Sequence, residues 1–330
     1  MPNVDIHCHV VAPLAQERMA GLNRQWAPRI IQREGGEYIV VNERFFGPVP
    51  PGMYDMAARL KDMEAAGIDR HVLSVVPLTF NYHLEPGIAV PFAQIQNDAI
   101  AALATERPEH FAGMATLPLQ DVGAAVKELE RAITRLGLKG AEIGTNVHGK
   151  NLDAPELFPL YEKAVELGVP LFVHPEDVAA SERLRRFFML NLVGNPLDTA
   201  IAIACVTLGG VLERYPELKL VFAHGGGYAP YQRGRLEHGY RVKAEARQGA
   251  PRPPSDYFGL LHFDSLIHYG PALEYLVTTC GSDKVLLGSD YPFEMGDPDP
   301  VGSVRGLKGV SEEDRRRILG ENAARLFRLD

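Results

Sequence analysis

The chain contains little cysteine: three residues among 330, namely Cys8, Cys205 and Cys280, and none belongs to a C-x-x-C pair. Few and scattered cysteines suit a reducing cytoplasm and exclude both a disulfide framework and a zinc knuckle built on thiolate pairs. Basic charge is also scarce, because 34 lysines and arginines stand against 42 acidic residues, for a net charge of −8. We therefore expect no nucleic-acid partner and favour a small molecule.

Long apolar runs are missing as well. No segment reaches the roughly 20 apolar residues that a membrane span needs, and the N-terminus lacks the charged and apolar regions of a signal peptide. We therefore expect a cytoplasmic protein without a membrane partner. What remains is an ordinary globular composition, with 46% hydrophobic and 23% charged residues.

Short β-branched or apolar stretches alternate with amphipathic ones from end to end, and no low-complexity linker divides the chain. Eight strands that are nearly all followed by helices indicate an α/β fold of the (β/α)8 barrel type rather than a doubly wound sheet. We expect one domain over residues 1–330, ending in a helix with a serine cap. The predicted strands are Val4–His7, His71–Val76, Phe111–Leu117, Gly140–Ile143, Leu171–His174, Leu218–His224, Leu261–Asp264 and Lys284–Asp290. The predicted helices are Met56–Ala66, Gln94–Ala104, Ala124–Leu136, Ala154–Leu167, Pro196–Tyr215, Pro271–Thr279 and Ser311–Phe327.

Two segments are additional to the strands and helices of a minimal (β/α)8 barrel. Residues 10–52 form a long insertion after the first strand, with a small hairpin expected around Glu37–Phe46. Gly249–Asp256 contains three prolines and predicts a stiff loop before the seventh strand. Long loops that follow barrel strands lie at the C-terminal face, where active sites form. The insertion is therefore a candidate lid, whereas a surface loop without function explains the second segment equally well.

Five polar residues come at the ends of predicted strands. His7 and His9 share the first strand, and strand side chains alternate, so both imidazoles point to the same side. His174, His224 and Asp290 close the fifth, sixth and eighth predicted strands. Because a barrel brings these strand ends together, we expect the five side chains to meet.

Three imidazoles and one carboxylate form a nitrogen and oxygen set that suits Zn²⁺, Fe²⁺ or Mn²⁺ and leaves a position for water. A lone histidine is more often a packed core residue or a surface bystander. Five polar residues at predicted strand ends are hard to explain in that way. We keep that interpretation for the other histidines, which are His71, His83, His110, His148, His238, His262 and His268.

An ordered series of motifs runs through the whole chain. They are Asp5-Ile6-His7-Cys8-His9, His174-Pro175, Leu192-Val193-Gly194-Asn195-Pro196, Gly209-Gly210-Val211-Leu212-Glu213-Arg214-Tyr215-Pro216, Phe222-Ala223-His224-Gly225-Gly226-Gly227 and Leu287-Gly288-Ser289-Asp290-Tyr291-Pro292-Phe293. With these motifs the chain resembles the amidohydrolase superfamily, and more closely its branch typified by 2-amino-3-carboxymuconate-6-semialdehyde decarboxylase. A single H-x-H pair is weak evidence, whereas the ordered series is specific for the branch.

The resemblance implies one divalent metal ion, most simply Zn²⁺, held by four ligands. These are His7, His9, His174 and Asp290, and His224 is implied to lie unligated beside the metal-bound water. Asp290 and His224 would then position and deprotonate that water, whose pKa the metal lowers. Superfamily members with two metals use a carboxylated lysine that ends the fourth strand. Lys139 stands instead at the start of that strand here, so we expect a single metal.

The resemblance also implies arginines for a small anionic substrate, because the planar guanidinium can bind both oxygens of a carboxylate. Arg235 stands where the family places an arginine that reaches into the neighbouring subunit, which implies a homodimer; a solvated helix arginine is the plainer interpretation. The family's other substrate arginine precedes a Pro-Val in the insertion, where this chain has Gly47. Arg44, three residues upstream, is the candidate substitute.

Two pocket positions depart from the family. Glu176 follows His174-Pro175, and Asn191 precedes Leu192-Val193-Gly194, where the family usually has tryptophan. Both changes make the pocket more polar and less suited to stacking a flat conjugated substrate. An added carboxylate near the metal would also repel a polyanionic substrate unless it turns away.

These features favour a metal-dependent decarboxylase that acts on a small unsaturated or aromatic carboxylate through a metal-bound water and His224. The alternative is a metal-dependent hydrolase or hydratase that uses the same residues on a carbonyl or a double bond. A non-catalytic metal-binding barrel is a third reading. A non-catalytic barrel would assign no role to His224 or to the Gly225-Gly226-Gly227 turn.

Overall fold

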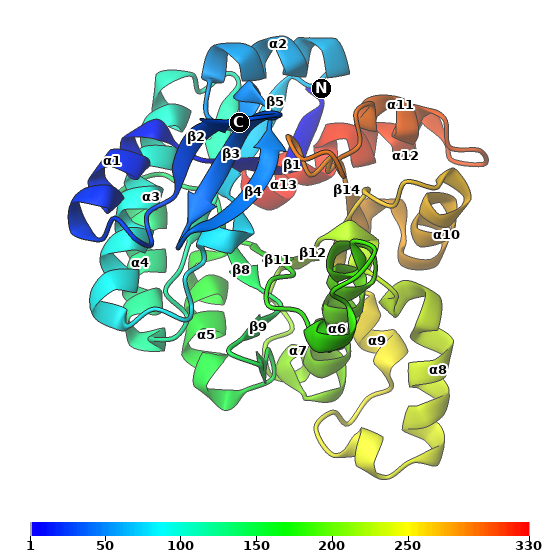
Figure 1. Ribbon diagram of the computed structural model, residues 1–330. Helices are drawn as coiled ribbons and strands as arrows, with labels where there is room; N and C mark the ends of the chain where they lie inside the picture. The colour runs from blue at the N-terminus through cyan, green and yellow to red at the C-terminus, as the bar shows by residue number, and fades with distance from the viewer. Residues whose placement is uncertain (1, 330) are drawn as a thin grey trace.

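Eight parallel strand positions form a closed barrel in the computed structural model, which describes residues 2–329 (Figure 1). A parallel bridge between Cys8 and Tyr291 closes the ring, together with a hydrogen bond of 3.0 Å from Ile6 N to Leu287 O. The predicted (β/α)8 fold is confirmed. Its strands are β1 (Val4–Val10), β5 (Arg70–Val75), β6 (Phe111–Gly113) with β7 (Ala115–Thr116), β8 (Ala141–Gly144), β11 (Leu171–His174), β12 (Leu220–Phe222), β13 (His262–Asp264) and β14 (Val285–Leu286).

Several strand predictions were wrong in extent: the first strand continues past His7 to Val10, and the sixth, predicted to reach His224, ends at Phe222. The third strand is not continuous over 111–117 but divides at Met114, so that β6 pairs with β5 and β7 pairs with β8. The eighth strand was predicted to reach Asp290, yet its ladder ends at Leu286. Beyond it the chain bends, and Asp290 has a positive φ of 60° that no strand residue adopts. The division at Met114 and the bend after Leu286 depend on the neighbouring strands, so the periodicity of the sequence alone does not predict them.

Helices surround the barrel on the outside (Figure 1). The predicted helix Pro196–Tyr215 is in fact two helices, because Gly210 takes a left-handed φ of 81° between them. The predicted C-terminal helix contains a π-helical turn at Arg317–Glu321. The helices are α2 (Met56–Ala66), α3 (Pro86–Glu106), α4 (Val122–Thr134), α5 (Phe158–Leu167), α6 (Asn195–Leu208), α7 (Val211–Arg214), α8 (Ala229–Val242), α9 (Pro254–Phe258), α10 (Gly270–Cys280), α11 (Pro300–Arg305), α12 (Glu312–Arg316) and α13 (Asn322–Phe327).

The insertion after β1 has more structure than the expected hairpin. It begins with α1 (Pro13–Leu22) and continues as an antiparallel sheet of β2 (Arg29–Arg33), β3 (Gly36–Val41) and β4 (Arg44–Val49). The hairpin itself is present, and its two-residue turn has positive φ at both positions, which suits the twist of the strands. Apolar residues of this sheet pack on residues that follow β1 and β5, so the insertion lies at the C-terminal face.

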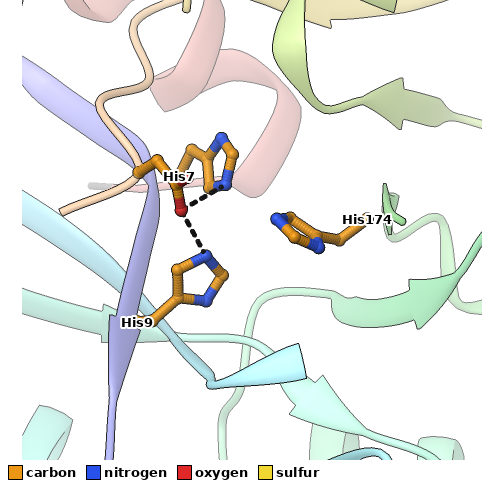
Figure 2. Close-up of side chains that lie close together, drawn as sticks. His7, His9 and His174 are labelled. Atoms are coloured by element: carbon orange, nitrogen blue, oxygen red, sulfur yellow. Dashed lines mark ion pairs between the residues drawn. The ribbon is translucent and has the colours of Figure 1, made fainter. Parts of the chain in front are cut away.

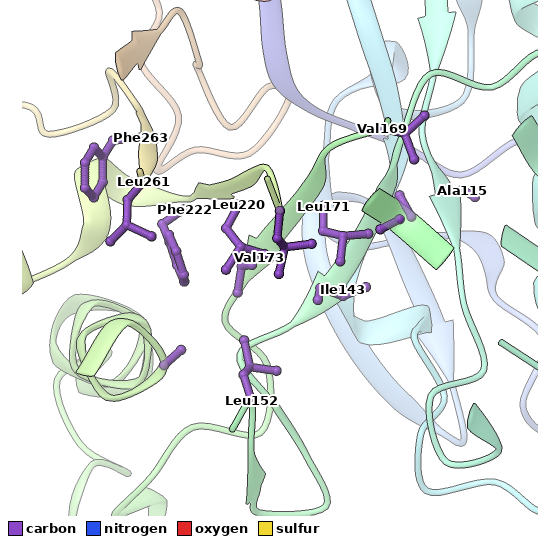
Figure 3. Packing of buried hydrophobic residues seen from close by; sticks show 14 of the residues in the cluster. Ala115, Ile143, Leu152, Val169, Leu171, Val173, Leu220, Phe222, Leu261 and Phe263 are labelled. Atoms are coloured by element: carbon purple, nitrogen blue, oxygen red, sulfur yellow. The ribbon is translucent and has the colours of Figure 1, made fainter. Parts of the chain in front are cut away.

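Two apolar layers position this face, and Figure 3 shows part of the outer one. Side chains that point outward from the strands, such as Leu171 and Phe222, pack under the helices. Side chains that point inward, such as Ile6 and Phe172, fill the lower barrel and meet Phe327 of α13. Because the lower interior is filled, the C-terminal mouth is where a site can form.

Among the described residues, one helical stretch is long and apolar enough to cross a membrane by length and composition, Leu190–Leu208. The sequence reading missed it. Most of this stretch is α6, the outer helix that follows β11, and its Ala202, Ile203 and Val206 belong to the buried apolar core. A core helix passes the same test, so the stretch is weak evidence for a membrane span.

Candidate metal centre

Four of the five predicted strand-end residues converge at the mouth of the barrel. His7 and His9 come from β1 and His174 ends β11 (Figure 2), and Asp290 follows β14. One ligand atom from each lies within 4.8 Å of the others. Asp290 Oδ1 is 3.0 Å from His9 Nε2 and 3.3 Å from His7 Nε2. All four are buried, so they form a polar group with little access to water.

A register shift in β1 produces the pair of inward histidines. Between Asp5 and Cys8 the pairing with β5 is irregular, as in a β-bulge. Ile6 packs in the lower apolar interior, while His7 and His9 also face the barrel axis one level higher. An unbroken alternation would place Ile6 and His7 on opposite faces. The bulge therefore changes the lining of the barrel from apolar to metal-binding within one residue.

The hydrogen bonds of the three imidazoles determine which nitrogen faces the centre. Each Nδ1 donates to an oxygen: His7 to Asp264 Oδ2 at 2.6 Å, His9 to Val75 O at 2.8 Å and His174 to Pro175 O at 3.0 Å. The Nε2 lone pairs then point into the centre, and these atoms and Asp290 Oδ1 have no hydrogen-bond partner. Buried acceptors that face one another without a donor are unfavourable. A cation removes this conflict, so the residues fit a metal ion.

Burial and charge set the protonation state of each of these side chains. Burial lowers the pKa of His9 and takes the pKa of His174 well below its usual value, so both rings are neutral, as metal ligands must be. Burial also acts to lower the pKa of His7, but Asp290 and Asp264 outweigh it and raise the pKa to about 10, so a metal ion that binds His7 displaces a proton from it. Burial opposes the charge of Asp290, yet His7 holds its pKa well below the usual range. The carboxylate is therefore ionised.

Asp264 is a supporting residue that the sequence reading missed. Besides the His7 imidazole, it accepts hydrogen bonds from the backbone N–H groups of His224 at 2.9 Å and Gly225 at 2.7 Å. One buried carboxylate thus fixes both the first strand and the turn that carries His224. A side chain on Gly288 would lie 2.8 Å from Asp264 and 2.9 Å from His7, so glycine is required there. The position of Asp264 at the end of a predicted strand was visible in the sequence, whereas its contact with His7 was not.

His224 lies beside the four converging residues without joining them. Its ring centroid is 5.1 Å from that of His174, and its Nε2 is 3.7 Å from Asp290 Oδ2. Its Nδ1 has no hydrogen-bond partner. Gly225, Gly226 and Gly227 all take positive φ values, and a side chain on Gly227 would collide with Pro196 O. The glycine run is therefore what turns the chain sharply enough to aim His224 at the centre.

Glu142 is a second buried acid that the sequence reading did not single out. It lies on β8 with its Oε1 3.8 Å from His9 Nδ1, and neither carboxylate oxygen has a hydrogen-bond partner. Burial raises its pKa well above the usual value. Lys139 lies just before β8, at the opposite end of the strand from the metal centre.

A further group of ligand-type side chains, Asp5, Cys8 and His71, lies within the same distance limits. The guanidinium of Arg59 already occupies this region, with Nη1 3.2 Å from His71 Nδ1. A positive charge supplied by the protein makes a second cation unfavourable there. Asp5, Cys8 and His71 therefore stabilise β1 and do not form a second metal site.

A cavity of about 230 Å³ lies between the insertion and the loops that follow β5 and β11. Arg44 and Glu176 both line it, together with aromatic side chains. Burial, with Asp177 beside it, raises the pKa of Glu176 to about 7. Asn191 lies in the π-helical turn Leu190–Gly194 and is not among the lining residues. Arg235 is exposed on α8 and does not contribute to the centre of its own chain.

This chain belongs to the amidohydrolase family, whose sequence model matches residues 4–329. It is 39% identical to the 2-amino-3-carboxymuconate-6-semialdehyde decarboxylase of Dictyostelium discoideum over 88% of this chain and 82% of that protein. The protein of the same name from Caenorhabditis elegans is 32% identical over 99% and 94%. The resemblance to this branch is confirmed.

Solved structures agree with the fold. The crystal structure of 5-carboxyvanillate decarboxylase from Sphingomonas paucimobilis matches with a TM-score of 0.78 and 28% identity over 84% of each chain.

Proposed function

We propose that this protein is a metal-dependent decarboxylase, a carbon–carbon lyase, of a small unsaturated or aromatic carboxylate. The observation that carries the proposal is the set of unpartnered Nε2 and carboxylate atoms at the barrel mouth, with an unligated histidine beside it. The names of the relatives, which are decarboxylases, support the same class of reaction.

His7, His9, His174 and Asp290 are the proposed ligands of one divalent ion. Three imidazole nitrogens and one carboxylate oxygen suit Zn²⁺ best, although Mn²⁺ and Fe²⁺ accept the same donors. When bound, the ion supplies Lewis acidity and lowers the pKa of a coordinated water. Asp264, Val75 and Pro175 hold the three imidazoles in the orientation that this binding needs.

The chain's own residues then divide the remaining work. Decarboxylation breaks the bond between a carbon and its carboxylate, leaves the electron pair on that carbon and requires a proton there. His224 Nε2, beside the Asp290 carboxylate, is placed to hold and move that proton. Arg44 lines the neighbouring cavity and is the proposed clamp for the anionic substrate.

The reaction class is tested by product analysis. The purified holoenzyme is incubated with a set of aromatic and dienoic carboxylates, and released CO₂ is measured beside products of hydrolysis or hydration. We expect stoichiometric CO₂ from at least one carboxylate. Addition of water to the substrate without loss of CO₂ would instead support the hydrolase or hydratase on the same site.

We further propose that the protein is a cytoplasmic homodimer in which Arg235 reaches the partner's active site. Arg235 is exposed, and its side chain forms no hydrogen bond or ion pair within residues 2–329. Tyr228, which precedes α8, and Tyr231 of α8 are also exposed, and the ring of Tyr231, which is 77% exposed, lies 6.2 Å from that of Tyr275. An arginine among exposed aromatics is typical of an interface.

Mixing of two inactive variants tests the role of Arg235. Arg235→Ala keeps its own His224, and His224→Ala keeps its own Arg235, so in a mixed dimer one of the two sites is complete. Statistical mixing should therefore restore about a quarter of the wild-type activity in a symmetric dimer. Arg233→Ala on the same helix serves as the control and should remain active alone. A mixture that stays inactive although mixed dimers form contradicts the shared site.

A further inference from the structure

Asp5 is a buried acid outside the four converging residues. It precedes His7 by two residues on β1, and its side chain has no exposed surface. Its Oδ1 accepts hydrogen bonds from His7 N at 2.9 Å and from Ser289 N at 3.2 Å, and its Oδ2 accepts one from the Ser289 hydroxyl. Both oxygens of the carboxylate are therefore used, and they join β1 to the turn that carries Asp290.

These bonds hold the turn on both sides of Asp290. Ser289 directly precedes Asp290, and its hydroxyl oxygen accepts a hydrogen bond from Tyr291 N at 3.1 Å. Asp290 itself has a φ of 60°, a left-handed conformation that is uncommon for a residue with a side chain, so surrounding contacts must hold it there. Asp290 N also donates to His7 O at 2.8 Å. The Asp5 carboxylate adds to this backbone bond a link through side chains that closes the turn.

Asp5 and Asp264 support the centre in different ways. Asp264 accepts from Nδ1 of the His7 imidazole and thereby sets the orientation of the ring. Asp5 binds the backbone of His7 and of Ser289, and thereby sets how the two segments that carry the ligands lie relative to each other. Asp290 Oδ1 is 3.3 Å from His7 Nε2, so a small shift of either segment changes the separation of these two atoms directly.

We propose that Asp5 is a positioning residue of the metal centre, which sets the separation of His7 and Asp290 without touching the ion or the substrate. Burying a carboxylate costs free energy, so a residue that only filled this space would be apolar. Replacing a group that supports metal ligands typically weakens metal binding by about 10- to 100-fold. The proposal rests on the proposed metal-dependent function, and Asp5 affects the reaction only through the ion.

Metal binding to the chelator-treated full-length protein tests this role. Asp5→Asn keeps the shape of the side chain but replaces one acceptor oxygen by an NH₂ group, which faces donors. We expect it to bind Zn²⁺ about 10- to 100-fold more weakly, as measured by competition with a chelating dye. The visible spectrum of the Co²⁺-loaded variant should also differ from that of the wild-type protein, because the spectrum depends on the arrangement of the ligands. A purely structural residue would lower stability and leave both readouts of the folded protein unchanged.

Ser289→Ala removes only the hydroxyl link and decides the question if Asp5→Asn does not fold. It should weaken Zn²⁺ binding as well, and the losses of the two variants should be less than additive in the double variant, because both belong to one network. Glu128→Gln is the matched control. Glu128 of α4 is 2% exposed and accepts a hydrogen bond of 2.6 Å from Asn97 of α3. This change should lower stability and leave both metal readouts unchanged.

Wild-type Zn²⁺ affinity together with a wild-type Co²⁺ spectrum, in folded Asp5→Asn or in Ser289→Ala, overturns the positioning role. Neither readout uses a substrate, so the test is separate from that of the reaction. If metal binding weakens as expected but no carboxylate releases CO₂, the decarboxylase is wrong and the role of Asp5 stands. If the wild-type protein releases CO₂ but both variants bind metal as it does, the role of Asp5 is wrong and the decarboxylase stands.

Discussion

Replacing His224 with alanine should lower kcat by roughly 10²- to 10⁴-fold, the usual contribution of a general acid or base. The metal content should remain that of the wild-type protein. Both expectations come from the geometry, because His224 lies 3.7 Å from Asp290 through Nε2 but is not one of the four residues whose ligand atoms converge. Loss of His224 therefore removes a proton carrier and leaves the proposed ligand set complete.

The measurement combines steady-state kinetics with elemental analysis of the same preparation. His110→Ala, a histidine exposed on the surface, is the matched control and should change neither quantity. A His224→Ala protein that loses its metal would make His224 a ligand. A variant that keeps its metal and its kcat would exclude the role in proton transfer.

Replacing Arg59 with methionine should lower the free energy of unfolding by about 2–4 kcal/mol, since two buried carbonyl oxygens each lose a charged donor. The Arg59 side chain is fully buried. Its Nε donates to Gly52 O at 3.0 Å, its Nη2 donates to His9 O, and its guanidinium lies 4.8 Å from the ring centre of Tyr291. One side chain of α2 thereby joins the end of the insertion, the first strand and the loop that carries Asp290.

Urea denaturation measures this effect. Lys61→Met on the same helix removes an exposed cation and should change the free energy of unfolding by less than about 0.5 kcal/mol. Arg59→Lys should recover only part of the loss, because an ammonium group cannot reproduce the planar fork of donors. A value for Arg59→Met within the range of the control would show that this contact does not stabilise the region.

The convergence of the metal centre was predictable because it depends on local pattern. His7 and His9 stand two residues apart on one strand, and His174 and Asp290 each follow an apolar run, so the barrel topology brings these positions to the same mouth. The contact between His7 and Asp264 joins residues 257 positions apart. Periodicity carries no information about which strand end supports which ligand, so Asp264 was missed.

In the fold, too, local sequence pattern predicts some features, while others depend on contacts between distant segments. Strand and helix positions followed from alternating apolar patterns, and α2 was predicted with its observed bounds. The bulge between Asp5 and Cys8 and the break at Met114 arise from pairing with neighbouring strands, which a single segment does not encode. The insertion was underestimated because β2 forms by pairing with β3, which the pattern of its own residues does not encode. Arg59 was missed because a charged residue on an amphipathic helix is normally solvated.

Metal reconstitution tests the central claim most directly. The protein is freed of metal with a chelator, Zn²⁺ or Mn²⁺ is added back in measured amounts, and CO₂ release from an active carboxylate is recorded at each step. A single ligand set at His7, His9, His174 and Asp290 predicts that activity returns in proportion to added metal and stops rising at one ion per chain. A rise that continues to two ions per chain, or full CO₂ release from the metal-free protein, would contradict a mononuclear metal-dependent decarboxylase.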